Sequence, residues 1–176
     1  RVDGRQRQRC RRDRTEEHVN QFDKKGFFVL EDAFDLDLIT KVRNLIDPFE
    51  EKVTEVLKVF KDGKVFISRA DEIAFSTHLV TQSEELKEFS KHKVFSSLCL
   101  DLIGKNVRLY WDQAVYKKPG TKDEFPWHQD NVYTFIEPQA YLTCWLALND
   151  TDESNVCPWV LTKLDRLGTL KHETID

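Results

Sequence analysis

His128 and Asp130 stand two residues apart, and an imidazole and a carboxylate at this spacing can bind one metal ion. In an extended chain, side chains at positions i and i+2 point to the same face, so both groups would face that ion. One His and one carboxylate are two of the three ligands in the facial triad of non-haem iron(II) oxygenases. The spacing is not specific, because 5 His and 17 Asp in 176 residues give about half of one such pair by chance. The alternative is a His and an Asp that bond each other or the backbone in a loop.

Gln113 is a second candidate, because it lies among apolar residues. Between Val107 and Val115 the odd positions are Val, Leu, Trp, Gln and Val, which predicts a half-buried strand with Gln113 on its apolar face. A buried carboxamide without a partner costs about 1–3 kcal/mol. Gln113 is therefore expected to bond either another protein group or a ligand in a cavity, and the residues leave both open.

Helices are expected mainly in the first half of the chain. Thr15 precedes an acidic first turn and Gly26 follows the last apolar position, which predicts a helix between them. Asp35 is expected to cap a longer amphipathic helix, which Pro48 kinks or restarts. Two further helices are predicted over residues 71–78 and 83–103.

Strands are expected mainly in the second half, where the apolar residues change from a helical to an alternating period. The predicted strands cover residues 27–30, 65–69, 107–115, 141–149 and 157–161. Helices first and strands last favour an α+β fold in which the sheet half carries the site.

The composition suits one domain with an ordinary core, since 40% of the 176 residues are hydrophobic. No apolar run approaches membrane-spanning length, so we expect no membrane partner. The four Cys show no disulfide or metal-knuckle spacing, and Cys99 and Cys144 lie in apolar stretches that favour buried free thiols. This Cys usage favours a reducing compartment, and without a recognisable targeting signal we expect an intracellular, cytoplasmic protein.

Charge is divided unevenly along the chain. Residues 1–14 hold seven Arg against two Asp, a net charge of +5, which leaves −9 on residues 15–176 from the total of −4. We expect residues 1–14 to form a disordered arm, because they have too few apolar side chains to bury. The acidic body argues against nucleic acid as the main partner, although an arm that binds nucleic acid or another acidic surface is an alternative. The sequence has no Met, so we expect a processed chain, a fragment or a mis-predicted gene product.

Four longer motifs carry more information than the His-x-Asp pair. They are QFDKKGFFVLEDAF from Gln21, YKKPG from Tyr116, PWHQDNVYTFIEPQ from Pro126 and YLTCWLALNDTDESN from Tyr141. In this order and spacing, residues 16–170 resemble the phytanoyl-CoA dioxygenase family of iron(II)/2-oxoglutarate oxygenases. Several motifs in one order are far more specific than a single pair, and they favour the metal site over the loop alternative.

The resemblance implies a fold and a set of site residues for residues 15–176. The fold would be a double-stranded β-helix, or jelly roll, with the N-terminal helices packed on its outside. His128 and Asp130 would be ligands of iron(II). Gln113 and Trp145 would line the pocket of the co-substrate 2-oxoglutarate, and Arg69 would lie near the basic residue that contacts it. The implied reaction hydroxylates an unactivated C–H bond of a small-molecule substrate, while 2-oxoglutarate and O₂ give succinate and CO₂, with ascorbate as an accessory.

The resemblance also implies that part of the site lies outside this chain. The family's distal His ligand and the Arg that pairs with 2-oxoglutarate belong to the second half of the jelly roll, which would follow Asp176. His172 resembles the loop before that half and not the ligand. We therefore expect an incomplete domain that self-associates through the open jelly-roll edge. Two functions stay open: a hydroxylase in its complete form, or a non-catalytic or fragmentary relative that serves as a binding module. No residue is assigned as catalytic, and nothing selects the substrate.

Overall fold

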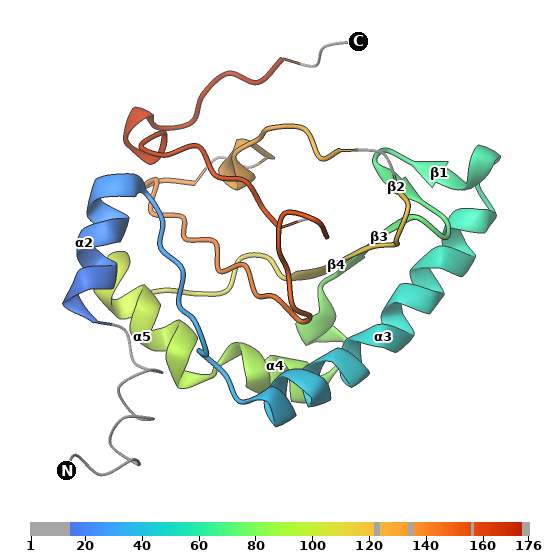
Figure 1. The fold of residues 1–176 in the computed structure, drawn as a ribbon, viewed down its shortest axis with the longest axis horizontal. Helices are drawn as coiled ribbons and strands as arrows, with labels where there is room; N and C mark the ends of the chain where they lie inside the picture. Colours follow the sequence, from blue (N-terminus) through green and yellow to red (C-terminus); the bar gives the residue numbers. More distant parts are fainter. Residues whose placement is uncertain (1–14, 122–123, 134–135, 156, 174–176) are drawn as a thin grey trace.

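The computed structural model describes residues 15–121, 124–133, 136–155 and 157–173, which form helices and one antiparallel sheet (Figure 1). The helices are α2 (Glu16–Lys25), α3 (Leu36–Lys58), α4 (Glu84–Ser90) and α5 (Lys93–Leu102), with short 3₁₀ turns η1 (Lys61–Gly63), η2 (Leu79–Thr81), η3 (Asp130–Tyr133) and η4 (Asp165–Leu167). The strands are β1 (Lys64–Val65), β2 (Ser68–Arg69), β3 (Ile73–Thr77) and β4 (Gln113–Lys117), in the order β1-β2-β3-β4. The predicted α+β class is confirmed. The predicted arm at residues 1–14 lies outside the described residues.

The residues predicted to end helices do so where they provide hydrogen-bond partners for free backbone groups. The backbone N–H of Thr15 donates to His18 at the start of α2, and Gly26 ends that helix with a φ of 84°. The helix α3 continues through Pro48 as one element, so the predicted restart does not occur. The predicted helix 83–103 is two helices, because the His92 ring accepts from the Val94 N–H and starts α5 anew.

The strand predictions are less accurate, because an extended segment becomes a strand only when it finds a partner. The predicted helix 71–78 is wrong: this segment is β3, which pairs with β4 from Ile73↔Lys117 to Thr77↔Gln113. Within the described residues, segments 27–30, 141–149 and 157–161 have no strand assignment, and the predicted strand 65–69 is the tight hairpin β1–β2. Local pattern does not reveal which segments meet a partner.

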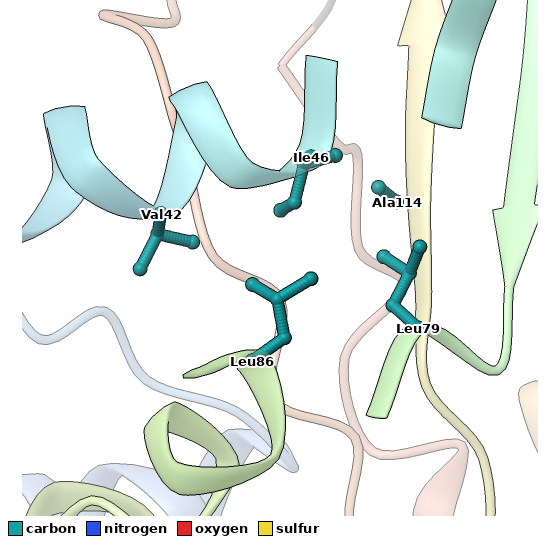
Figure 2. Packing of buried hydrophobic residues seen from close by; sticks show 5 residues of the cluster. All are labelled: Val42, Ile46, Leu79, Leu86 and Ala114. Atoms are coloured by element: carbon teal, nitrogen blue, oxygen red, sulfur yellow. The ribbon is translucent and has the colours of Figure 1, made fainter. Parts of the chain in front are cut away.

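The core lies between α3, α4, the turn η2 and the strand β4 (Figure 2). Its buried members are Val42, Ile46, Leu79, Leu86 and Ala114. Leu148 packs against this cluster from the segment that follows the candidate metal residues. In β4 the even-numbered residue Ala114 faces the core. Its small side chain leaves room for the helices to pack against the strand. No helix among the described residues has the length and apolar character that crossing a membrane requires.

The predicted strand 107–115 is found only in part, because residues 107–112 have no strand assignment and β4 begins at Gln113. The odd-numbered face, defined as Val107, Leu109, Trp111, Gln113 and Val115, is exposed, contrary to the prediction of a half-buried apolar face. Its four apolar members keep 43–54% of their surface exposed. Exposed apolar side chains that adjoin one another are typical of association surfaces.

The first prediction concerns Tyr116, which ties the sheet to α3. Its hydroxyl donates to Asp47 Oδ1 at 2.5 Å, and desolvation, followed by this hydrogen bond, raises the Tyr116 pKa above its usual range. The unfolded chain releases this proton near pH 10 while the folded protein keeps it, so the free energy of unfolding should fall as the pH rises above about 10. Urea unfolding from pH 8 to 11 should show a smaller alkaline loss in Tyr116→Phe than in the original protein. The matched variant Tyr133→Phe, at a residue with 77% exposure, should follow the original protein. An equal alkaline loss in Tyr116→Phe would contradict this account.

The second prediction concerns the odd-numbered face, through which we propose that the chain self-associates. Sedimentation velocity of the whole chain should show dimers or larger species that increase with concentration. Placing charges on this face, as in Leu109→Lys with Val115→Lys, should shift the distribution to monomer, because charged side chains are costly to bury without a partner. Leu36→Lys, at an apolar residue with 80% exposure in α3, is the matched control. A monodisperse monomer with one cooperative melting transition would overturn the proposal.

Candidate metal and co-substrate site

The side chains of His128 and Asp130 meet at the entry to the turn η3. The His128 Nδ1 lies 2.7 Å from the Pro126 carbonyl oxygen. A carbonyl oxygen only accepts, so Nδ1 carries the proton and donates it, which leaves the Nε2 lone pair free. This Nε2 faces Asp130 Oδ1 at 3.4 Å. In the neutral imidazole both facing atoms are hydrogen-bond acceptors, so a proton or a metal ion between them would interact favourably with both.

The second oxygen of Asp130 is held by a different part of the chain. The Thr143 hydroxyl donates to Asp130 Oδ2 at 2.7 Å. The contact leaves Oδ1 to face His128. Divalent ions bind His nitrogen and carboxylate oxygen at about 2.1 Å, so atoms 3.4 Å apart would subtend about 108° at such an ion. The His128–Asp130 pair therefore fits a divalent metal.

Gln129, between the two candidate ligands, points to the opposite side and binds the segment 168–172. Its side chain donates to the Gly168 carbonyl at 3.1 Å and accepts from the Leu170 N–H at 2.8 Å. Its backbone N–H donates to His172 Nε2 at 3.0 Å. The segment 168–172 is thus attached to the metal motif through Gln129, and the side chain of the neighbouring Asn131 adds a hydrogen bond to the Thr169 hydroxyl at 2.8 Å.

His172 already uses both of its ring nitrogens in these contacts. Its Nδ1 lies 2.8 Å from the Leu170 carbonyl oxygen, so this nitrogen donates and Nε2 accepts from Gln129. Both ring nitrogens of His172 are therefore engaged within the chain. Among the described ranges, no group of three or more His, Cys, Asp or Glu side chains is gathered to hold a metal.

Aromatic side chains lie in and beside segment 141–149, which contacts Asp130 through Thr143. The rings of Tyr110 and Tyr141 lie 6.0 Å apart, and desolvation, followed by the charge of Asp130, raises the Tyr141 pKa. Trp145, two residues beyond Thr143, keeps 58% of its surface exposed.

The other two predicted co-substrate residues bind other side chains. Gln113 begins β4 on the exposed odd-numbered face, where its side-chain oxygen accepts from the Trp111 indole at 3.1 Å. Arg69 ends β2 and forms an ion pair with Glu72 at 3.0 Å. Figure 1 shows the β1–β2 hairpin well to the side of the chain that carries η3. The structure thus brings His128 and Asp130 together without placing Arg69 beside them.

Thr143 and Tyr141 are site residues that the sequence reasoning missed. A signal was available, because Tyr141, Thr143 and Trp145 alternate along the predicted strand 141–149 and so share one face of an extended chain. Two hydroxyl groups beside a Trp on one face indicate that this face can form hydrogen bonds with another part of the chain or with a ligand. Nothing in the sequence indicates that the partner of Thr143 would be Asp130.

The cysteines differ from the expectation of buried thiols. Cys99 is half-buried, whereas Cys144 is exposed, and both are free thiols, as is the half-buried Cys157. Cys144 lies beside Thr143, on the segment that faces the candidate site.

Comparison with known proteins places this chain in a family. The profile of the family described as Phytanoyl-CoA dioxygenase (PhyH) matches residues 22–163. Phytanoyl-CoA dioxygenase 1 of Oryza sativa subsp. japonica is 29% identical over 161 residues, which cover 87% of this chain and 54% of that protein. Phytanoyl-CoA dioxygenase of Arabidopsis thaliana is 28% identical over 111 residues, which cover 62% of this chain and 39% of that protein. No solved structure matches the chain.

The matched region includes the whole His128-to-Trp145 stretch and most of the folded elements. The chain belongs to the phytanoyl-CoA dioxygenase family. It spans about half the length, or less, of the curated relatives it matches.

The third prediction concerns the contacts of Gln129. Replacing Gln129 with Ala removes two side-chain hydrogen bonds, which together stabilise the docking of segment 168–172 by about 1–3 kcal/mol. Amide hydrogen exchange at Leu170 should therefore be faster in Gln129→Ala. Gln82→Ala, which removes a side-chain bond to the Thr77 carbonyl, is the control and should leave Leu170 unchanged. Equal exchange at Leu170 in the original protein and Gln129→Ala would show that the contact contributes nothing.

Proposed function

We propose that this chain carries the first part of an iron(II)/2-oxoglutarate-dependent dioxygenase, with the fold of a partial jelly roll. The observation that carries the proposal is the facing pair of acceptors, His128 Nε2 and Asp130 Oδ1, at 3.4 Å. Two acceptors in this arrangement fit a shared divalent ion, and one His with one carboxylate is typical of iron(II) oxygenases. Membership of the phytanoyl-CoA dioxygenase family supports the same reaction class.

The proposed roles follow from the chemistry of each side chain. His128 and Asp130 hold iron(II), and the Pro126 carbonyl keeps the His128 ring in the tautomer that offers Nε2. Iron(II) with 2-oxoglutarate and O₂ supplies the hydroxylation of an unactivated C–H bond, with succinate and CO₂ as the other products. Trp145 offers an aromatic face to the co-substrate or substrate, while Gln113 and Arg69 offer polar groups. Ascorbate belongs to the proposal as an accessory that maintains reduced iron.

The substrate in this proposal is a small molecule. The Tyr133 ring lies 6.2 Å from the His128 ring, and desolvation, followed by the charge of the nearby Asp130 carboxylate, raises the pKa of Tyr141. Aromatic side chains around the pair suit an apolar or partly apolar substrate. An intracellular, cytoplasmic location is also part of the proposal and rests on the free thiols of the described cysteines.

A second candidate is a non-catalytic relative that uses the scaffold as a binding module. It is favoured by one observation: across residues 15–121, 124–133, 136–155 and 157–173, the metal motif has two ligands, and the nearby His172 is engaged with Gln129. Two protein ligands hold a divalent ion more weakly than three. The two candidates differ in whether 2-oxoglutarate joins the metal.

The fourth prediction is the test of these candidates. Anaerobic titration of the whole chain with iron(II) in the presence of 2-oxoglutarate should produce the weak visible charge-transfer band of the chelate. His128→Ala should lose the band, because the imidazole ligand is removed. His18→Ala, at a His that caps α2, should keep it.

The outcomes separate the two candidates. A band that His128→Ala abolishes supports the oxygenase and justifies a substrate screen that follows succinate formation. Tight metal binding without the band would favour a binding module. A well-folded chain that shows neither would overturn the proposed metal site.

A further inference from the structure

We propose that Thr143 is a positioning residue that fixes the rotation of the Asp130 carboxylate for metal binding. This inference rests on the proposed function, because it concerns how the chain prepares the same ligand pair. It adds a residue from segment 141–149 to a motif that otherwise comprises only residues 126–130.

The argument starts from the two oxygens of Asp130. One of them, Oδ2, accepts from the Thr143 hydroxyl at 2.7 Å, while Oδ1 faces His128 Nε2 at 3.4 Å. A carboxylate with both oxygens in water rotates freely and presents either oxygen, or neither, to the imidazole. Holding Oδ2 on Thr143 leaves one rotational state, in which Oδ1 stands opposite Nε2.

The two ligand side chains need such a restraint because they are partly exposed to solvent. The side chains of His128 and Asp130 keep 39% and 43% of their surface exposed, so surrounding protein does not immobilise them by packing. Each ligand has instead one outward hydrogen bond: His128 to the Pro126 carbonyl and Asp130 to Thr143. Partners of this kind in metal sites orient the ligands, and their loss lowers metal affinity roughly 10- to 100-fold.

The placement of the neighbouring residues supports the assignment. Tyr141, two residues before Thr143, is close enough to Asp130 for the carboxylate charge to affect it. Thr143 is also β-branched, so its hydroxyl has few orientations and gives a stiff restraint.

The experiment measures binding of Mn²⁺ alone, by the loss of the electron paramagnetic resonance signal of the free ion. Thr143→Val keeps the shape and removes the hydroxyl, so its affinity should fall roughly 10- to 100-fold. Thr143→Ser keeps the hydroxyl and should bind within a few-fold of the original protein. Thr81→Val is the matched control, because the Thr81 hydroxyl also makes an exposed 2.7 Å bond, to the His78 carbonyl, away from the ligand pair. Equal melting temperatures would separate positioning from stability.

A second readout needs no metal. The ¹³C shift of the Asp130 carboxylate at neutral pH, assigned by its loss in Asp130→Asn, should move in Thr143→Val and return in Thr143→Ser. Equal Mn²⁺ affinity in the original protein and Thr143→Val would overturn the inference, as would failure of Thr143→Ser to restore binding. If the original protein binds no Mn²⁺, the proposed metal site fails, and an unchanged carboxylate shift in Thr143→Val then refutes the Thr143 contact independently.

Discussion

The antiparallel ladder between β3 and β4 is the constraint on which the other elements depend. Its five residue pairs, from Ile73↔Lys117 to Thr77↔Gln113, join two segments about forty residues apart. The ladder buries Ile73 and Ala74 on one strand and Ala114 on the other, and α3 and α4 pack over it. At its end, the Lys118 N–H donates to the Glu72 carbonyl and directs the chain into the loop that leads to Pro126. Without this ladder, neither the core nor the start of the metal motif has a fixed position.

The geometry of the candidate site is maintained in a different way from that of the core. Its members lie on coil and a single 3₁₀ turn, with side chains more than a third exposed, so packing contributes little to their geometry. The side chains are oriented by hydrogen bonds to atoms that would not bind a metal. These atoms are Nδ1 of His128, Oδ2 of Asp130 and the side-chain amide of Gln129. His128 is held by Pro126 within the motif, whereas Asp130 and Gln129 are held by segments 141–149 and 168–172. The chemistry of the pair therefore depends on the specificity of a few polar contacts and not on a rigid sheet.

The sequence was sufficient for features that depend on local chemistry. Thr15, Gly26 and Ser83 mark helix ends because caps and left-handed turns act within one turn of the chain. The order of the four motifs was sufficient for the family, which the match over residues 22–163 confirms. Features that depend on contacts between residues far apart in the sequence could not be predicted from it. Ile73 to Thr77 is a strand because β4 lies beside it, and the odd-numbered face is exposed because Ala114 turns the opposite side toward α3 and α4. The contact between Thr143 and Asp130 joins segments that no local pattern relates.

The attachment of Gln129 to residues 168–172 has a consequence for the order of folding. Its bonds to Gly168, Leu170 and His172 close loops of 39 to 43 residues, whose entropic cost is met only after both ends are ordered. The segment 168–172 lies C-terminal to the helices and to both strands of the β3–β4 ladder, so it is synthesised after them. During synthesis, the helices and the β3–β4 ladder can thus assemble while the metal motif is still unrestrained. Gln129 gains these partners only when the segment around Leu170 has emerged and docked, so this part of the motif is ordered late in the synthesis of the chain.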